Sequence, residues 1–193
     1  MTAPGELRLR RREQLRAAGV YLVTEEALSD GRTSEDVAAA ALAVDADGVH
    51  LGQDDLPVAT ARASLGPDAL IGLSITDPAQ LEALDVRDAD YLGVGAVFPT
   101  GSKADARYTG LELLAAARAA VDVPIVAIGG ITLANAAAAV LAGADVVAVI
   151  SAIAAAPDPG LAARQLLEAV TVAGRARPGG AGQARPRVAG ATT

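Results

Sequence analysis

Six short apolar runs recur along this chain at an average step of about 25 residues, and this spacing limits the possible folds more than any other feature. Each run is apolar at consecutive positions, which is typical of a strand buried on both faces. Alternation of such strands with helices predicts right-handed βαβ units and a parallel α/β sheet, either closed as a barrel or left open. The predicted strands are 19–23, 48–51, 70–74, 91–97, 124–128 and 146–150.

The segments between these runs predict helices, because they are Ala-rich or amphipathic and several begin at a capping residue or Pro. The strands and helices fill a single domain over 19–172. A basic arm over 1–18 precedes it, and a Gly-, Pro- and Arg-rich tail over 173–193, expected to be disordered, follows it. Both ends are expected to be solvated. The predicted helices are 33–44, 57–65, 78–84, 110–121, 134–142 and 158–170.

The composition excludes several classes of protein. There is no Cys and only one His, His50, so neither a thiolate metal site nor a His-based triad is expected. The net charge is −7, with +3 on 1–16 and +4 on 173–193, which leaves −14 on the body and argues against nucleic-acid binding. No apolar run is long enough for a membrane span. We therefore expect a cytoplasmic protein with small-molecule partners, and a homo-oligomer is left open.

Polar and Gly residues gather directly after the predicted strands. In a parallel barrel the carboxyl ends of all strands meet on one face, and sites are built there. Each position taken singly is more often a helix cap than a ligand contact, but together they favour an anion site. The positions are Thr24, Gln53 to Asp55, Ser74, Thr100 to Lys103, Gly129-Gly130 and Ser151.

The segment after the fourth predicted strand carries the most chemistry. Within four residues it supplies two hydroxyls, Thr100 and Ser102, the flexible Gly101, and the first Lys of the chain, Lys103. Hydroxyls and backbone N–H groups are directed donors, and Lys is a point charge, so the loop is suited to holding a phosphate. The alternative is an ordinary turn with a solvated Lys.

Two further positions have both a structural and a functional interpretation. Asp54 and Asp55 lie between a strand and the helix at Pro57, where they can cap the helix or bind Mg²⁺ beside a diphosphate that supplies the remaining oxygens. His50 lies inside a strand run and is interpreted as a structural histidine.

The order and spacing of several motifs over 42–170 resemble the thiamine phosphate synthase family. Residues 19–41 also fit the first strand and helix of that family. The Pro-Thr-x-Ser/Thr-Lys loop and His-Leu-Gly-Gln-x-Asp are seldom found together in other families. The motifs are Gly48-Val-His-Leu-Gly-Gln-Asp-Asp55, Gly72-Leu-Ser74, Asp90-Tyr-Leu-Gly-Val-Gly-Ala-Val-Phe-Pro-Thr-Gly-Ser-Lys103, Pro124-Ile-Val-Ala-Ile-Gly-Gly-Ile131 and Gly143-Ala-Asp with Val149-Ile-Ser151.

The resemblance implies a TIM-barrel enzyme, a transferase that joins hydroxymethylpyrimidine diphosphate to thiazole phosphate and releases pyrophosphate. It implies Mg²⁺ as cofactor, bound by Asp55, and contacts from Ser74 and Lys103 to the diphosphate. Lys103 is then the catalytic residue, because it stabilises the leaving group. The residues implied to hold the thiazole phosphate are Thr100, Gly101, Ser102, Gly130, Ile150 and Ser151.

The sequence departs from the family between about Ala41 and Gly48. There the family has a second strand ending in Gln-x-Arg-x-Lys, a helix, and a third strand ending in Asn-Asp, and this chain has neither motif. The expected fold is therefore an incomplete TIM barrel of about six strands instead of eight. Two alternatives to a working synthase stay open: a truncated, poorly active remnant that binds only thiazole phosphate, and a relative of the thiazole tautomerases.

Overall fold

The structure, a computed structural model, describes residues 5–22, 47–52, 54–83, 89–99 and 108–177. Six strands form one sheet in which every neighbouring pair is parallel, in the order β1-β6-β5-β4-β3-β2. All six predicted strands are therefore confirmed. Their bounds are β1 Val20–Leu22, β2 Gly48–Leu51, β3 Leu70–Ile75, β4 Tyr91–Val94, β5 Ile125–Ile128 and β6 Val146–Val149.

Helices follow the strands as the sequence predicts. Five of the expected helices are present, each starting within two residues of the predicted start, and the one expected at 33–44 lies outside the described residues. Helix α6 begins two residues late because Asn135 serves as its N-cap residue. The helices are α1 Glu6–Ala18, α3 Val58–Leu65, α4 Pro78–Ala83, α5 Gly110–Ala120, α6 Ala136–Leu141, α7 Ser151–Ala154 and α8 Pro159–Ala176.

The sheet has the order of a βα barrel but does not close within the part of the chain that the structure describes. Each strand from β2 to β6 pairs with the next along the chain, and β1 pairs with β6. No pairing among the described residues joins β1 to β2, so these two strands are the edges of the described sheet. The fold is thus an incomplete TIM-type barrel, as the sequence predicts. None of the described helices has both the length and the apolarity of a membrane-crossing segment.

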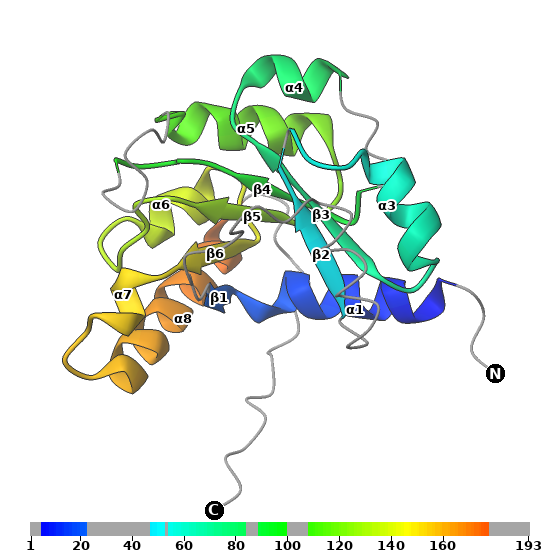
Figure 1. Ribbon diagram of the computed structural model, residues 1–193. Helices are drawn as coiled ribbons and strands as arrows, with labels where there is room; N and C mark the ends of the chain where they lie inside the picture. The colour runs from blue at the N-terminus through cyan, green and yellow to red at the C-terminus, as the bar shows by residue number, and fades with distance from the viewer. Residues whose placement is uncertain (1–4, 23–46, 53, 84–88, 100–107, 178–193) are drawn as a thin grey trace, which may run out of the picture.

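The main core lies between the sheet and the helices that cover it. Alternate side chains of a strand point to opposite faces, and Leu92, Val94 and Ile125 point toward the helices and are fully buried. Valine and alanine side chains of β5 and β6 fill the opposite face, where Leu15 of α1 packs on them. Figure 1 shows α1 along the lower side of the sheet and α4 and α5 along the upper side.

The prediction of a solvated basic arm is wrong, because α1 lies across the amino ends of the strands. Arg11 pairs with Asp47, which precedes β2, at 2.5 Å, and donates to the carbonyl of Asp68 before β3 at 2.9 Å. Arg16 donates to the carbonyl of Asp122, before β5. The Arg residues of α1 therefore satisfy acceptors at the starts of the strands, which is why this basic segment is part of the domain.

Two buried carboxylates join neighbouring strands at this end of the sheet. Asp145, at the start of β6, accepts the N–H of Ile125 at 3.0 Å and pairs with Arg118 at 3.0 Å and Arg177 at 2.9 Å. Asp90, at the start of β4, accepts the N–H of Ile71 at 2.9 Å in the same way. Helix α8 ends only at Ala176, so residues 173–176 are helical, contrary to the prediction that the disordered tail begins at 173.

Candidate active site

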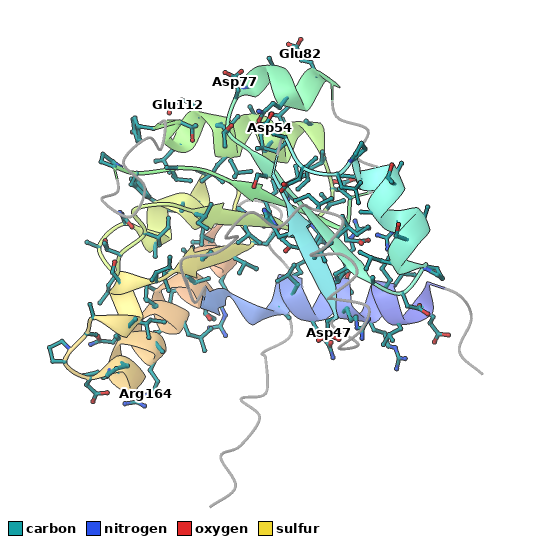
Figure 2. The ribbon with its side chains drawn as sticks, in the orientation of Figure 1. Asp47, Asp54, Asp77, Glu82, Glu112 and Arg164 are labelled. Carbon is teal, nitrogen blue, oxygen red and sulfur yellow. The ribbon has the colours of Figure 1, made fainter. Side chains whose placement is uncertain are left out.

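Some of the residues that the sequence places after the strands, namely Asp54, Asp55, Gly129, Gly130 and Ser151, follow the described strands at their carboxyl ends, whereas Ser74 lies within β3 and both Thr24 and Gln53 lie outside the described residues. Asp47 precedes β2 and Asp54 follows it, and Figure 2 shows Asp47 near the lower end of the molecule and Asp54 near the upper end. All the strands are parallel, so their carboxyl ends share the end of the sheet at which Asp54 follows β2, away from α1. In parallel α/β proteins this is the end that carries the active site.

The ends of β4 and β5 are joined beyond the regular sheet. The N–H of Val97 donates to the carbonyl of Ile128 at 2.9 Å, and the N–H of Phe98 donates to the carbonyl of Gly129 at 3.1 Å. Gly130 has a φ of 64°, and a Cβ built on it would lie 2.4 Å from the carbonyl oxygen of Pro99. Only Gly fits here, and its absent side chain lets the two segments touch.

The turn at Gly130 is held by a side chain that the sequence analysis did not identify. The amide of Asn135 donates to the carbonyl of Gly130 at 2.9 Å, and its oxygen accepts the N–H of Thr132 at 2.7 Å. Ile128 of β5 pairs with Ala148 of β6, Gly130 and Ile150 each come two residues after one of these partners, and Ser151 begins α7. Three predicted site residues, Gly130, Ile150 and Ser151, therefore follow the carboxyl ends of two neighbouring strands.

The other loop residues, Thr100, Gly101, Ser102 and Lys103, lie outside the described residues. Both ends of the segment that contains them are described. On one side Pro99 lies against Gly130, and on the other the N–H and hydroxyl of Thr109 both donate to the carbonyl of Ala96, at 2.8 and 3.0 Å. The described chain therefore leaves the sheet at Pro99, beside Gly130, and lies against Ala96 again at Thr109.

Asp55 lies at the end of β2, as predicted. Its Oδ2 accepts the N–H of Gly52 at 2.6 Å, which fixes the carboxylate at the carboxyl end of the strand. This contact lies within the loop and does not cap α3, whose N-cap residue is Pro57 and which has no side-chain cap hydrogen bond. Among the described residues no group of three His, Cys, Asp or Glu side chains is arranged to hold a metal ion. A cation at Asp55 would need ligands in addition to the described side chains, and Mg²⁺ commonly takes oxygen ligands from substrate phosphates.

Ser74 belongs to a chain of hydrogen bonds that runs across three strands. Its hydroxyl lies 3.0 Å from Nε2 of His50, and Nδ1 of His50 lies 3.1 Å from the hydroxyl of Tyr91. Burial of the ring lowers the pKa of His50, and the negative charge of Asp55 acts in the opposite direction. His50 is thus a neighbour of two predicted site residues, Ser74 and Asp55, and its interpretation as a structural histidine stays a prediction.

The sequence does contain a signal for His50. Leu51 is buried among the residues of α3 and β3, so His50, one position earlier, points to the opposite face of the sheet. Gly72 pairs with both His50 and Tyr91, and Ser74 pairs with Gly93. Alternate positions of three neighbouring strands therefore carry Gly or a polar side chain, and His50 is exposed there while Tyr91 and Ser74 are half-buried.

Four acidic side chains of the described residues lie near the upper end of the molecule. Figure 2 shows Asp54, Asp77, Glu82 and Glu112 there, and Asp54 and Glu82 are exposed. Such a rim repels a bare phosphate or diphosphate at neutral pH. An anionic substrate therefore needs a cation or directed donors close to the strand ends.

Comparisons with known proteins agree with this site. The family model described as thiamine monophosphate synthase matches residues 34–153. A thiamine-phosphate synthase of Moorella thermoacetica is 48% identical over 161 residues, which cover 83% of this chain and 72% of that protein. Among solved structures, a thiamine phosphate pyrophosphorylase from Pyrococcus furiosus matches with a TM-score of 0.64 and 32% identity, covering 87% of this chain and 90% of that one.

One comparison bears on the shortened region. A thiamine-phosphate synthase of Haloarcula marismortui is 48% identical over 202 residues, which cover 96% of that protein but 78% of this chain. Because 78% of 193 residues is about 150, about 50 positions of the relative have no counterpart here. This agrees with the expected absence of an internal segment. The matched region contains β2 to β6 and every predicted site residue, and the chain therefore belongs to the thiamine monophosphate synthase family.

Proposed function

We propose that this chain forms thiamine phosphate from hydroxymethylpyrimidine diphosphate and thiazole phosphate, at the carboxyl ends of β2 to β6. The observation that carries the proposal is the junction of β4, β5 and β6. There Pro99, which precedes the Thr100 to Lys103 loop, lies against Gly130, and Ile150 and Ser151 follow β6, the strand paired with β5. This junction belongs to a chain that shares the family of its thiamine-phosphate synthase relatives.

The thiazole phosphate is assigned to this junction. Backbone N–H groups near Gly130, Ile150 and Ser151 can approach its oxygens closely because Gly130 has no side chain. Thr100, Gly101 and Ser102 supply further donors from the adjoining loop. The tightness of the contact between Gly130 and Pro99 supports this assignment, since it fixes where the loop begins.

The diphosphate is assigned to the β2 and β3 side, between Ser74, Asp55 and Lys103. Asp55 would hold Mg²⁺ together with diphosphate oxygens, and its carboxylate is already oriented by the N–H of Gly52. When bound, the metal would neutralise negative charge on the diphosphate and improve it as a leaving group. The acidic rim supports a requirement for this cation and for Lys103.

The reaction then needs little covalent participation by the protein. The bond between the pyrimidine methylene carbon and the diphosphate oxygen breaks, and its electron pair leaves with pyrophosphate. The lone pair of the thiazole nitrogen forms the new bond to that carbon. Lys103 and the Ser74 hydroxyl stabilise the departing charge, while the β4–β6 junction holds the thiazole nitrogen in line.

A second candidate function is a half-site that binds only thiazole phosphate. The observation in its favour is the set of about 50 positions of the Haloarcula relative that this chain lacks. The resemblance assigns the main pyrimidine-diphosphate contacts and a second Mg²⁺ carboxylate to such a segment. The β4–β6 junction is intact in either case.

Release of pyrophosphate from purified protein given both substrates and Mg²⁺ tests the proposal, with Lys103→Ala as the control. The synthase proposal predicts release that requires both substrates and is lost in the variant. If no release occurs and thiazole phosphate still raises the melting temperature, the half-site is supported and the synthase proposal is refuted. The proposal includes a cytoplasmic setting, consistent with a chain without Cys, and leaves room for a homo-oligomer.

A further inference from the structure

The turn that follows β5 directs two successive carbonyl groups to the same side. The carbonyl of Ile128 accepts the N–H of Val97 at 2.9 Å, and the carbonyl of Gly129 accepts the N–H of Phe98 at 3.1 Å. In a regular strand, successive carbonyls point instead to the two opposite neighbouring strands. Gly129 departs from this pattern because its φ is 91°. Both carbonyls therefore face the β4 side, since Val97 and Phe98 follow β4.

Peptide geometry then gives the direction of the N–H of Gly130. In a planar trans peptide the N–H points opposite to the C=O of the same peptide unit. The carbonyl of Gly129 faces Phe98, so the N–H of Gly130 points away from β4. Because β5 lies between β4 and β6, this N–H points to the side of the turn on which Ile150 and Ser151 follow β6.

Asn135 fixes the next peptide of the turn. Its Nδ2 donates to the carbonyl of Gly130 at 2.9 Å, so the N–H of Ile131 points away from Asn135. The amide of Asn135 is itself held, because its Oδ1 accepts the N–H of Thr132 at 2.7 Å. Gly130 has a φ of 64° and no Cβ, so sterics alone do not fix its peptide planes. The directions of the two N–H groups, of Gly130 and Ile131, therefore depend on one backbone contact and one side chain.

These two N–H groups are available to a ligand. Within the part of the chain that the structure describes, no carbonyl or side chain accepts a hydrogen bond from the N–H of Gly130 or of Ile131. Successive N–H groups in a turn are the donors from which anion-binding concavities of proteins are built. Gly130 is only half-buried, so the turn is open to solvent.

We propose that Asn135 is a positioning residue, which holds the carbonyl of Gly130 and so directs the N–H groups of Gly130 and Ile131 toward the phosphate of the thiazole substrate. The proposal rests on the proposed function for the identity of that anion. Asn135 does not touch the substrate and acts only through the turn. Ile131, which the sequence analysis did not include in the site, becomes one of its donors through its backbone.

The amide protons of the turn report directly on these donors. A charge-assisted hydrogen bond to a phosphate oxygen moves an amide proton signal downfield. In wild-type protein at pH 7 we expect the signals of Gly130 and Ile131 to move downfield on saturation with thiazole phosphate, and in the same direction with inorganic phosphate. If neither ligand moves them more than the signal of Val170, which lies in α8, the proposal is overturned.

Two Asp variants separate the hydrogen bond of Asn135 from a change of charge. Asn135→Asp can still accept the N–H of Thr132, but at pH 7 it cannot donate to Gly130. Ala134→Asp adds the same charge at the neighbouring exposed position and keeps the contacts of Asn135. Calorimetric titration should give a dissociation constant for thiazole phosphate roughly tenfold higher in Asn135→Asp than in Ala134→Asp. The affinity for pyrophosphate with Mg²⁺ should be equal in the two variants.

The outcomes distinguish this proposal from the proposed function. Equal dissociation constants for thiazole phosphate in the two folded variants would refute the positioning role even if the wild type is an active synthase. If Asn135→Asp does not fold, Asn135→Ser, whose neutral side chain is too short to reach Gly130, replaces it and is compared with the wild type. Amide shifts and a tenfold difference in a wild type that makes no thiamine phosphate would support the positioning role and refute the synthase proposal.

Discussion

Replacement of Gly130 by Ala should damage both the fold and the thiazole-phosphate half of the site. Gly130 has a φ of 64°, and a left-handed conformation costs a residue with a Cβ roughly 1–2 kcal/mol. The new Cβ would also lie 2.4 Å from the carbonyl oxygen of Pro99, whereas ordinary contacts begin at 3.4 Å, so the segment must move by about 1 Å.

That movement strains the two hydrogen bonds that join Val97 and Phe98 to the end of β5. Each such bond contributes roughly 0.5–1.5 kcal/mol, so the total loss of unfolding free energy should be about 2–5 kcal/mol. A displacement of this size at a binding site should also weaken thiazole-phosphate binding by roughly 100-fold.

Gly5 offers a matched control, because its φ is 81° but the nearest atom to a built Cβ is 3.9 Å away. Urea unfolding and calorimetric titration with thiazole phosphate should be measured for both variants. Gly5→Ala should lose only the roughly 1–2 kcal/mol that a left-handed conformation costs a residue with a Cβ, and it should bind thiazole phosphate normally. Equal losses in the two variants, or normal binding by Gly130→Ala, would refute the claim that Gly130 holds the loop against the site.

Two further predictions concern the ion pairs of Asp145 and the pKa of His50. Asp145→Asn should lower the free energy of unfolding by about 3 kcal/mol, because Arg118 and Arg177 lose their charged partner. Asp158→Asn is the control: Asn can still cap the exposed start of α8, so this variant should change little in the same urea titration. Since the pKa of His50 is lowered in the folded protein, stability should fall as the pH drops below 6.5, and His50→Gln should remove this component from the pH dependence of the melting temperature.

The strands could be predicted from the sequence because their apolar runs are consecutive and regularly spaced. The role of α1 could not, because its Arg residues suggest a solvated arm until their partners are known. Those partners, such as Asp47 and Asp68, come from segments far along the chain. Helix α8 was predicted too short for a similar reason, since Arg177 beyond its end pairs with Asp145.

The candidate site was predicted in outline but not in its connections. Position after a strand was enough to place Asp55 and Gly130 at the carboxyl ends of the strands. The hydrogen bond between His50 and Ser74 depends instead on the pairing register of β2 with β3, which no local pattern specifies. Asn135 was missed because its contact with Gly130 is visible only once the turn is built.

Mass-spectrometric detection of thiamine phosphate tests the central claim most directly. Purified wild-type chain, both substrates and Mg²⁺ should yield thiamine phosphate in equal amount to pyrophosphate, and omission of either substrate should abolish the product. Pyrophosphate without thiamine phosphate, or neither product from a folded chain whose melting temperature thiazole phosphate still raises, would contradict the claim that this chain is a synthase.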